Sequence, residues 1–400
     1  MALGPERELA SSLVAFSVDA ALHRPPAAVA FKAESEHVTQ DLQRVFSQIK
    51  KDDPACPPAD LVLSNGQTVA VSKGAGPAFS GSGSQIFKSS DNRFVVKVIN
   101  SNEISDLKML IPELAFLRTV RLAGITPAFF EVADDDAMET QCRERLVVTE
   151  FLGDSTLDSL QKLEREERKR LLPEIAVAVL TQLKRLHAEG LIHGDIRAAN
   201  FVFSDPQNFA KSLRMIDFGR ATPYVDPSGR PLRSEAADYG SHFSAKFLSP
   251  WEIAQFVKTR RDDLFRTAEM LVMLGGFAGT MVLEQDLCMQ NLRQVHTVAS
   301  VKVAAVKEAH ARRASADEIA GLHADAQAKI AEIESTKESC RVRAYLTKTN
   351  PSKLAPETPQ IYKDFYNYCL ALDADSEPAY DQWIDTFTQF GKSLEPIIQQ

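Results

Sequence analysis

Two short polar clusters, each flanked by apolar residues, constrain this chain more than any other feature. The first lies in LIHGDIRAANFVF, residues 191–203, where Asp195, Arg197 and Asn200 stand between two apolar arms. The second is IDFG, in which Asp217 follows Asp195 by 22 residues. Because a buried polar group is costly unless it is paired or used, we expect a fold that gathers these side chains into one site.

The residue types in these clusters suit phosphoryl transfer. One acid can accept the proton of a hydroxyl, and an amide with a second acid can hold a divalent cation. HGDIRAAN resembles the H-R-D-L-K-x-x-N catalytic loop of the eukaryotic-type protein kinase superfamily, and DFG matches that family's metal-binding motif. The resemblance implies ATP and Mg²⁺ as cofactors and a structural role for His193. It also implies Asp195 as the base, Arg197 against the γ-phosphate, and Asn200 and Asp217 as metal ligands.

The upstream sequence contains counterparts of that family's nucleotide site. Lys97 in VVKV resembles the strand lysine that holds the α and β phosphates, and Glu113, 16 residues later, resembles its paired glutamate. Glu103 is a second candidate for this pairing. Gly81 and Gly83 in SGSGSQIF resemble the glycine loop over the phosphates, although the third glycine is missing. Backbone N–H groups can approach phosphate closely where no Cβ intervenes.

The resemblance also implies an adenine pocket. Thr149 in VVTEFLGD would guard the back of this pocket, while Glu150 and Leu152 would offer backbone groups to the adenine edge. The roof and floor of the pocket would be formed by Ile86, Val95, Val202 and Ile216.

Two departures from the family pattern bear on regulation and on the acceptor. Gly194 stands where the family carries the arginine that meets an activation-loop phosphate, so a phosphorylated loop has no evident cationic receiver. We therefore expect activity that does not depend on loop phosphorylation. Arg197 replaces the lysine usual in serine/threonine kinases and keeps its positive charge. The expected acceptor is a protein hydroxyl, serine or threonine ahead of tyrosine, although Arg197 alone does not settle this preference.

Two other functions remain open on the sequence. HGD also occurs in kinase-like phosphotransferases of small molecules, and residues 89–103 locally resemble lipid phosphatidylinositol phosphate kinases. Alternatively, the chain is an ATP-binding pseudokinase that serves as a scaffold. The DFG triplet favours a protein substrate. The scaffold is disfavoured because the chain retains Lys97, Asp195, Asn200 and Asp217.

The resemblance implies an α+β, bilobal protein-kinase-like fold with a small β-rich N-lobe and a larger helical C-lobe. Residues 85–89 and 93–99 read as two strands joined by a turn, and the stretch 366–387 is similar to the last helices of casein-kinase-type enzymes. We expect five segments: a partly helical leader (1–60), the N-lobe and hinge (61–152), the C-lobe core (153–284), an Ala/Glu-rich helical insertion (285–356) and terminal C-lobe helices (357–400). A protein partner at the insertion is a further hypothesis.

Composition limits the compartment and the partners. The net charge of −8 gives no reason to expect a nucleic-acid partner. Five scattered cysteines without C-x-x-C spacing predict a reducing, cytoplasmic environment. No signal-peptide pattern is seen at the N-terminus. The most apolar window, residues 270–283, has 14 residues, too few to span a bilayer, and is expected to form one buried helix.

Overall fold

A computed structural model describes most of the 400-residue chain. The described residues are 26–48, 61–71, 79–81, 84–99, 104–120, 124–133, 146–153, 155–226, 228–232, 249–250, 258–312 and 315–394. The chain divides into two compact units. The first comprises Met1–Glu164, Pro173–Leu232 and Glu377–Gln400, and the second comprises Arg165–Leu172 and Arg233–Ser376.

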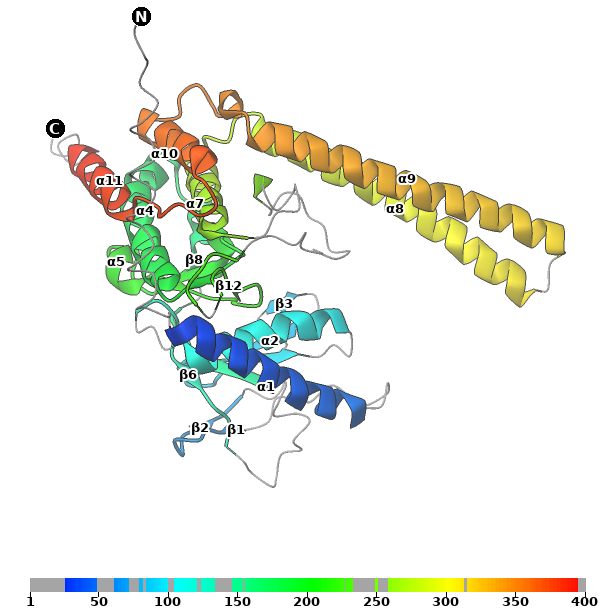
Figure 1. Cartoon of the computed structure of the whole chain (residues 1–400), viewed down its shortest axis with the longest axis horizontal. Coiled ribbons are helices and arrows are strands. Elements are labelled where there is room, and N and C mark those ends of the chain that lie inside the picture. Colours follow the sequence, from blue (N-terminus) through cyan, green and yellow to red (C-terminus); the bar gives the residue numbers. More distant parts are fainter. Residues whose placement is uncertain are drawn as a thin grey trace, which may run out of the picture. The chain divides into compact units, whose positions relative to one another are not determined.

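An antiparallel sheet of five strands forms the β-rich part of the first unit (Figure 1). The strand order is β3 (Phe79–Gly81), β4 (Ser84–Lys88), β5 (Phe94–Ile99), β7 (Leu146–Glu150) and β6 (Phe129–Phe130). The two strands predicted around residues 85–99 are confirmed as β4 and β5. The turn between them is closed by a hydrogen bond from Asn92 N to Ser89 O, 3.0 Å long.

The two faces of this sheet differ because side chains alternate along a strand. Phe94, Val96 and Val98 of β5 are buried in an apolar cluster. The hairpin of β1 (Leu61–Val62) and β2 (Thr68–Val69) contributes to the same cluster. The alternate residues Val95 and Lys97 are only half-buried and face the other side, where the polar side chains described below meet.

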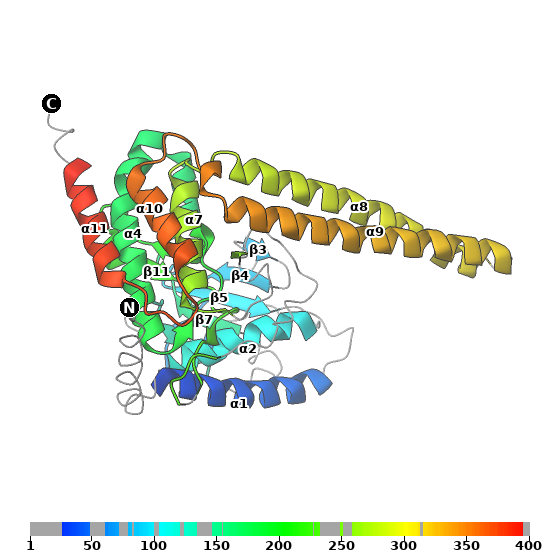
Figure 2. The same cartoon turned by 45° about the horizontal axis from the view of Figure 1, so that its top comes forward.

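Two helices accompany the sheet. Helix α2 (Ile104–Thr119) is continuous across Pro112. Helix α1 (Pro26–Gln48) contacts α2 and lies beside it in both views (Figures 1 and 2). It falls within the predicted leader. Residues 8–22 of the leader, whose apolar spacing is typical of a helix, lie outside the described residues.

Short strand pairs hold the ends of the HGDIRAAN segment in the first unit. Strand β9 (Leu191–Ile192) pairs with β12 (Thr222–Pro223) just before the segment. After it, η2 (Ala198–Asn200) leads into β10 (Phe201–Phe203), which pairs with β11 (Arg214–Met215). The other neighbour of β10 is β8 (Ser155–Thr156). The two apolar arms seen in the sequence are thus buried strands that fix the polar loop at both ends.

Helices lead into and close this part of the chain. Helix α4 (Arg165–Ala188) precedes the HGDIRAAN segment and follows the 3-10 helix η1 (Leu157–Lys162). Gly190 adopts the left-handed φ of 77° that ends a helix without a steric cost. In the first unit, the terminal helix α11 (Tyr380–Leu394) is tied to α4 by an ion pair between Lys184 and Asp381, 2.6 Å long.

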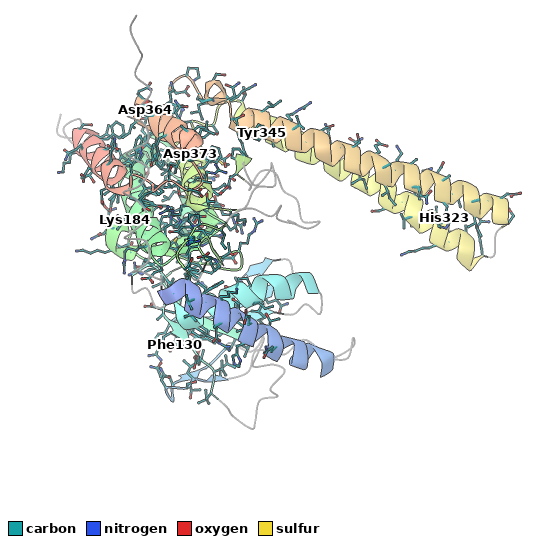
Figure 3. All side chains as sticks on the ribbon, in the orientation of Figure 1. Phe130, Lys184, His323, Tyr345, Asp364 and Asp373 are labelled. Carbon is teal, nitrogen blue, oxygen red and sulfur yellow. The ribbon has the colours of Figure 1, made fainter. Side chains whose placement is uncertain are left out.

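The second unit is helical. It contains α7 (Arg260–Leu274), α10 (Gln360–Ala371) and two long helices, α8 (Met281–Ala311) and α9 (Ala316–Lys348), that run antiparallel as a hairpin (Figures 1 and 2). Figure 3 shows Tyr345 near one end of this hairpin and His323 near the other. Most of the segment predicted as an Ala/Glu-rich helical insertion, residues 285–356, lies in this hairpin.

The base of the hairpin is anchored by buried charges. Lys348, at the last turn of α9, is fully buried and pairs with Glu269 of α7 at 2.7 Å. Arg266 contacts the same carboxylate, and the Tyr366 hydroxyl donates to the Lys348 carbonyl at 2.8 Å. A carboxylate between two cations satisfies the requirement that buried charges be paired.

One helix prediction is wrong. The apolar window 270–283 does not form a single buried helix, because α7 ends at Leu274 and α8 begins at Met281. The break falls at Gly275 and Gly276, and Gly276 has a φ of 71°, which is unfavourable for other residues. None of the helices in the described residues is long and apolar enough to cross a membrane.

Candidate active site

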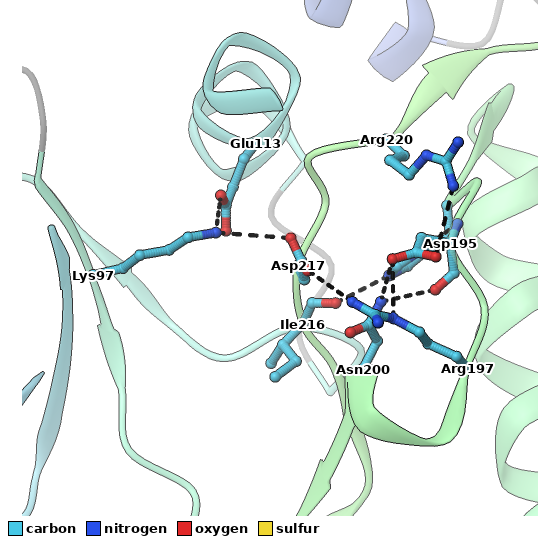
Figure 4. A network of polar contacts seen from close by, with 9 residues as sticks. Lys97, Glu113, Asp195, Arg197, Asn200, Ile216, Asp217 and Arg220 are labelled. Atoms are coloured by element: carbon cyan, nitrogen blue, oxygen red, sulfur yellow. Dashed lines mark hydrogen bonds and ion pairs between the residues drawn. The ribbon is translucent and has the colours of Figure 1, made fainter. Parts of the chain in front are cut away.

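The site is built around an ion pair inside the first unit. Lys97 on β5 and Glu113 on α2 lie 2.6 Å apart, Nζ to Oε2, and Lys97 Nζ is also 3.7 Å from an oxygen of Asp217 (Figure 4). The side chain of Glu113 is 8% exposed and that of Lys97 is 20% exposed. Glu103, the other candidate partner of Lys97, lies outside the described residues.

Burial and charge act in opposite directions on this pair. Burial works against the charge of Lys97, but the carboxylates of Glu113 and Asp217 outweigh it and raise the pKa of Lys97. Burial raises the pKa of Glu113, with Asp217 acting in the same direction and Lys97 opposing both. Lys97 is therefore charged at neutral pH, and its charge favours the ionised form of Glu113.

The carboxylate of Asp195 is held by three neighbours. Asn200 Nδ2 donates to Asp195 Oδ2 at 2.9 Å, and Arg197 Nε lies 3.1 Å from the same oxygen. Arg220 Nη1 approaches the other oxygen, Oδ1, at 3.9 Å (Figure 4). Asp195 is 8% exposed, so a small part of its surface remains open to a reacting group.

Asn200 and Asp217 offer oxygen ligands for a metal ion. Asn200 Nδ2 donates to both the backbone oxygen and Oδ2 of Asp195, which leaves its Oδ1 as an acceptor. Asp217 has a φ of 65° and lies 3.7 Å from Arg197 Nη2. Within the described ranges, no group of three or more His, Cys, Asp or Glu side chains could hold a metal alone. One carboxylate plus an amide fits Mg²⁺, which takes few protein ligands and completes its shell with phosphate oxygens and water.

His193 has a structural role. Asp195 N donates to His193 Nδ1 at 3.3 Å, so Nε2 carries the proton and donates to the carbonyl of Ile216 at 3.1 Å. The ring also packs at 4.8 Å from the ring of Phe218. Nδ1 thus holds the loop itself, and Nε2 joins the loop to the DFG segment.

Two contacts in the site escaped the sequence reasoning. The rings of Phe116 on α2 and Phe218 stack at 3.8 Å with an angle of 6° between their planes, which couples the helix that carries Glu113 to the DFG segment. Arg220 directly follows DFG and approaches Asp195. Its position in DFGR is the only signal in the sequence, and it does not predict which way the side chain points.

The residues predicted to line the adenine pocket occupy the expected strands and the segments that follow them. Val95 lies opposite Thr149 across β5 and β7, and Ile86 lies opposite Lys97. Glu150 N donates to Ala128 O at 2.8 Å. Half-buried side chains occur at Ile86, Val95, Thr149, Leu152, Val202 and Ile216. Gly81 ends β3. Gly83 lies outside the described residues.

Comparison with known proteins identifies the family. The family model for the protein kinase domain matches residues 74–385, more than three quarters of the chain. The chain belongs to the protein kinase family. A solved structure of vaccinia related kinase 3 has a TM-score of 0.54 at 12% identity and covers 89% of this chain and 96% of its own. The predicted α+β protein-kinase-like fold is therefore confirmed.

Among curated kinases, casein kinase I homologues are similar to part of this chain. Casein kinase I homolog 1 of Saccharomyces cerevisiae is 31% identical over 123 residues, which are 30% of this chain and 22% of the yeast protein. A probable serine/threonine-protein kinase of Streptomyces coelicolor is 29% identical over 128 residues, 32% of this chain and 18% of that protein. The chain spans about a fifth of the length of the curated relatives that it matches.

Proposed function

We propose that this kinase transfers the γ-phosphate of ATP to a serine or threonine hydroxyl of a protein. The observation that carries the proposal is one connected polar network, in which Glu113, Lys97, Asp217, Arg197 and Asp195 follow one another at 2.6–3.7 Å. The similarity to casein kinase I homologues and to a probable serine/threonine kinase supports serine or threonine as the acceptor.

Each residue in the network has a separate task in this proposal. Lys97, oriented by Glu113, would hold the α and β phosphates, and Arg197 would neutralise charge on the γ-phosphate. Asn200 and Asp217 would hold Mg²⁺, which when bound neutralises charge that develops on the phosphate oxygens. Asp195 would accept the proton of the acceptor hydroxyl, since Asn200 and Arg197 already fix the orientation of its carboxylate.

The nucleotide pocket is part of the same proposal. The Glu150 carbonyl and the Leu152 backbone would bind the adenine edge, with Thr149 at the back of the pocket. The adenine would lie between the apolar side chains of Ile86, Val95, Val202 and Ile216, beneath the loop that contains Gly81 and Gly83. The lobe and insertion boundaries given above, at residues 60, 152, 284 and 356, are also proposals.

A transfer assay with three classes of acceptor tests the function. Radiolabelled ATP is offered with a protein mixture, with phosphoinositides and with small alcohols in parallel. We expect label on protein serine or threonine. Label confined to lipid or small alcohols would contradict the proposal, and a thermal shift with Mg·ATP but no transfer would indicate a pseudokinase scaffold.

We expect activity that does not require phosphorylation of the segment after DFG. The reason is Gly194, which has a φ of 73° and offers no cation to a loop phosphate. Protein made in a host without other protein kinases and then treated with phosphatase should keep its initial rate within about twofold, a change of less than ~0.5 kcal/mol in barrier. A preparation that gains activity only after autophosphorylation would contradict this.

We also propose that the outer face of α9 binds an acidic, partly apolar segment of a protein partner. Val342 and Leu346 are 50% and 60% exposed although both are apolar. They line a groove of about 720 Å³ together with Arg343 and Lys353. Besides the buried Lys348, residues 339–353 contain three basic residues, Arg341, Arg343 and Lys353, and no acidic one, which favours an acidic partner.

The double substitution Val342→Ser and Leu346→Ser is expected to weaken binding of such a partner by at least about tenfold while transfer to a generic substrate is unchanged. Cross-linking of the full chain in lysate, followed by titration with the captured protein, measures the affinity. Ile330→Ser on the same helix, 47% exposed and outside the groove, is the matched control. Equal affinity for all three proteins, or a captured partner without acidic residues, would contradict the proposal.

The expected compartment is likewise a proposal. Cys369 is a buried free thiol, and burial raises the pKa of this thiol well above its usual range. Buried neutral thiols are inert and do not need an oxidising environment. They therefore support a reducing, cytoplasmic location.

A further inference from the structure

We propose that α1, which contacts both α2 and strand β12, is a positioning element of the active site that holds α2 and its Glu113 in place. The proposal rests on the proposed function in so far as Glu113 is needed to orient Lys97. It gives the N-terminal helix a task that its sequence does not reveal. Three sets of contacts carry it, all inside the first unit.

The first set is apolar. Ala27, Ala28, Phe31 and Val38 are buried on α1, and residues 27, 31 and 38 fall on one face of a helix. Helix α1 contacts α2 along this part of the unit, and both views show the two helices side by side (Figures 1 and 2). Phe31, 4% exposed, is the largest of these side chains. A buried aromatic ring contributes a large share of the energy of the packing that it makes.

The second contact is an ion pair between the two helices. Glu34 Oε1 of α1 and Arg118 Nη1 of α2 are 3.1 Å apart, with side chains that are 24% and 26% exposed. Arg118 lies in the last turn of α2, five residues after Glu113. The pair therefore fixes α2 close to the residue that meets Lys97. Partial burial shields it from solvent more than an ordinary surface pair.

The third contact reaches the other side of the site. Helix α1 also contacts β12, whose Thr222 follows Asp217 by five residues and pairs with Ile192 of β9. The loop with Asp195 begins directly after β9, and Arg220, just before β12, approaches Asp195. One helix thus touches both the element that carries Glu113 and the strand pair that anchors the catalytic loop.

These contacts hold α2 in position, a task to which phosphorylation of the activation loop contributes in other protein kinases. In protein kinases, phosphorylation of the activation loop and the position of the helix bearing the glutamate together control whether the lysine–glutamate pair forms. Gly194 removes the receiver for a loop phosphate in this chain. A helix that is covalently part of the chain and packed on α2 and β12 keeps the Lys97–Glu113 pair formed without a modification.

Charge reversal across the α1–α2 contact tests the proposal. In the full chain, Glu34→Arg and Arg118→Glu are each expected to lower kcat about two- to fivefold, the range of a partly exposed ion pair. The double variant, in which the charges are exchanged, should recover most of that loss. Phe31→Ala should lower kcat about tenfold. The matched control is the exchange Lys302→Glu with Asp325→Lys in the α8–α9 hairpin, whose 2.9 Å pair should be neutral for activity.

Hydrogen exchange of the α2 backbone, residues 104–119, separates positioning from mere stability. The hydrogen-exchange rate of these amides should rise in Glu34→Arg and in Phe31→Ala. It should return to the wild-type rate in the double variant with swapped charges, and it should be unchanged in the hairpin control. Unaltered α2 exchange in the single variants, or kcat losses that the exchanged pair does not recover, would overturn the proposal. If wild-type protein transfers no phosphate, the proposed function fails, and the exchange data alone still decide whether α1 holds α2.

Discussion

Asp195→Asn should abolish most phosphoryl transfer and leave Mg·ATP binding intact. The side chain keeps its size and its place beside Asn200 and Arg197, but it no longer accepts a proton. General base catalysis by a positioned side chain contributes about 10²–10⁴-fold, and we expect the rate to fall by that factor. Binding should persist because Lys97, Asn200 and Asp217, which are proposed to hold the nucleotide and its metal, are unchanged.

A single-turnover assay with saturating Mg·ATP measures the rate, and the thermal shift on adding Mg·ATP measures binding. Asp205→Asn is the matched control, because this exposed aspartate caps a turn in the same unit through Gln207 N at 2.8 Å and lies outside the site. It should leave both quantities unchanged. Near-normal transfer by the Asp195→Asn protein would refute the assignment of Asp195 as the base.

The elements around the site were predictable where local pattern and tertiary position agree. The strands β4 and β5 follow a period of two with a polar turn between them, so their existence and register needed only local sequence. The pairing of Lys97 with Glu113 was predicted from the family resemblance, because the sequence itself does not say how close the two residues lie in space. The residues lie 16 positions apart on different elements, and no local rule would have joined them.

Contacts between distant segments were not predictable. The ion pair of Glu34 with Arg118 joins residues 84 positions apart, and neither residue is unusual for an exposed helix face. The pairs β9–β12 and β10–β11 have only two residue partners each, too few for a periodic signal. The prediction of one helix over residues 270–283 was wrong for a different reason. The whole window is apolar, so only Gly275 and Gly276 indicate the break between the two helices.

Substitutions of Lys97 and Glu113 can separate the catalytic role of this ion pair from its structural role. Lys97→Met should lower kcat/KM for ATP about 10²–10³-fold, because a charged partner for developing phosphate charge is lost. It should also destabilise the fold, since Glu113 is left buried without its cation. Breaking a fully buried pair costs about 3–5 kcal/mol. At pH 8 we expect Lys97→Met to lower the free energy of unfolding by about 1–3 kcal/mol. The loss is smaller than for a fully buried pair because Glu113 can take up a proton.

Protonation of Glu113 gives the loss of stability in Lys97→Met a defined dependence on pH. Burial raises the pKa of Glu113 above the ordinary 4.5 even beside Lys97, and removal of Lys97 raises it further. A carboxyl whose folded pKa is raised causes no penalty at low pH, where it is protonated in both states, and destabilises the folded state as pH rises through that pKa. The difference in melting temperature between wild type and Lys97→Met should therefore grow from pH 5 to pH 8.

Adding Glu113→Gln to Lys97→Met should reverse the structural effect alone. The double variant has no buried carboxyl at position 113, so it should melt higher than Lys97→Met at pH 8 and lose the extra pH dependence. Its kcat/KM should stay as low as that of Lys97→Met, because the phosphate-binding cation is still absent. Melting curves over pH together with initial rates at subsaturating ATP measure both quantities. Recovery of activity with stability would mean that Lys97 only holds α2 in place, whereas equal stability of both variants would mean that Glu113 is not buried as a charge.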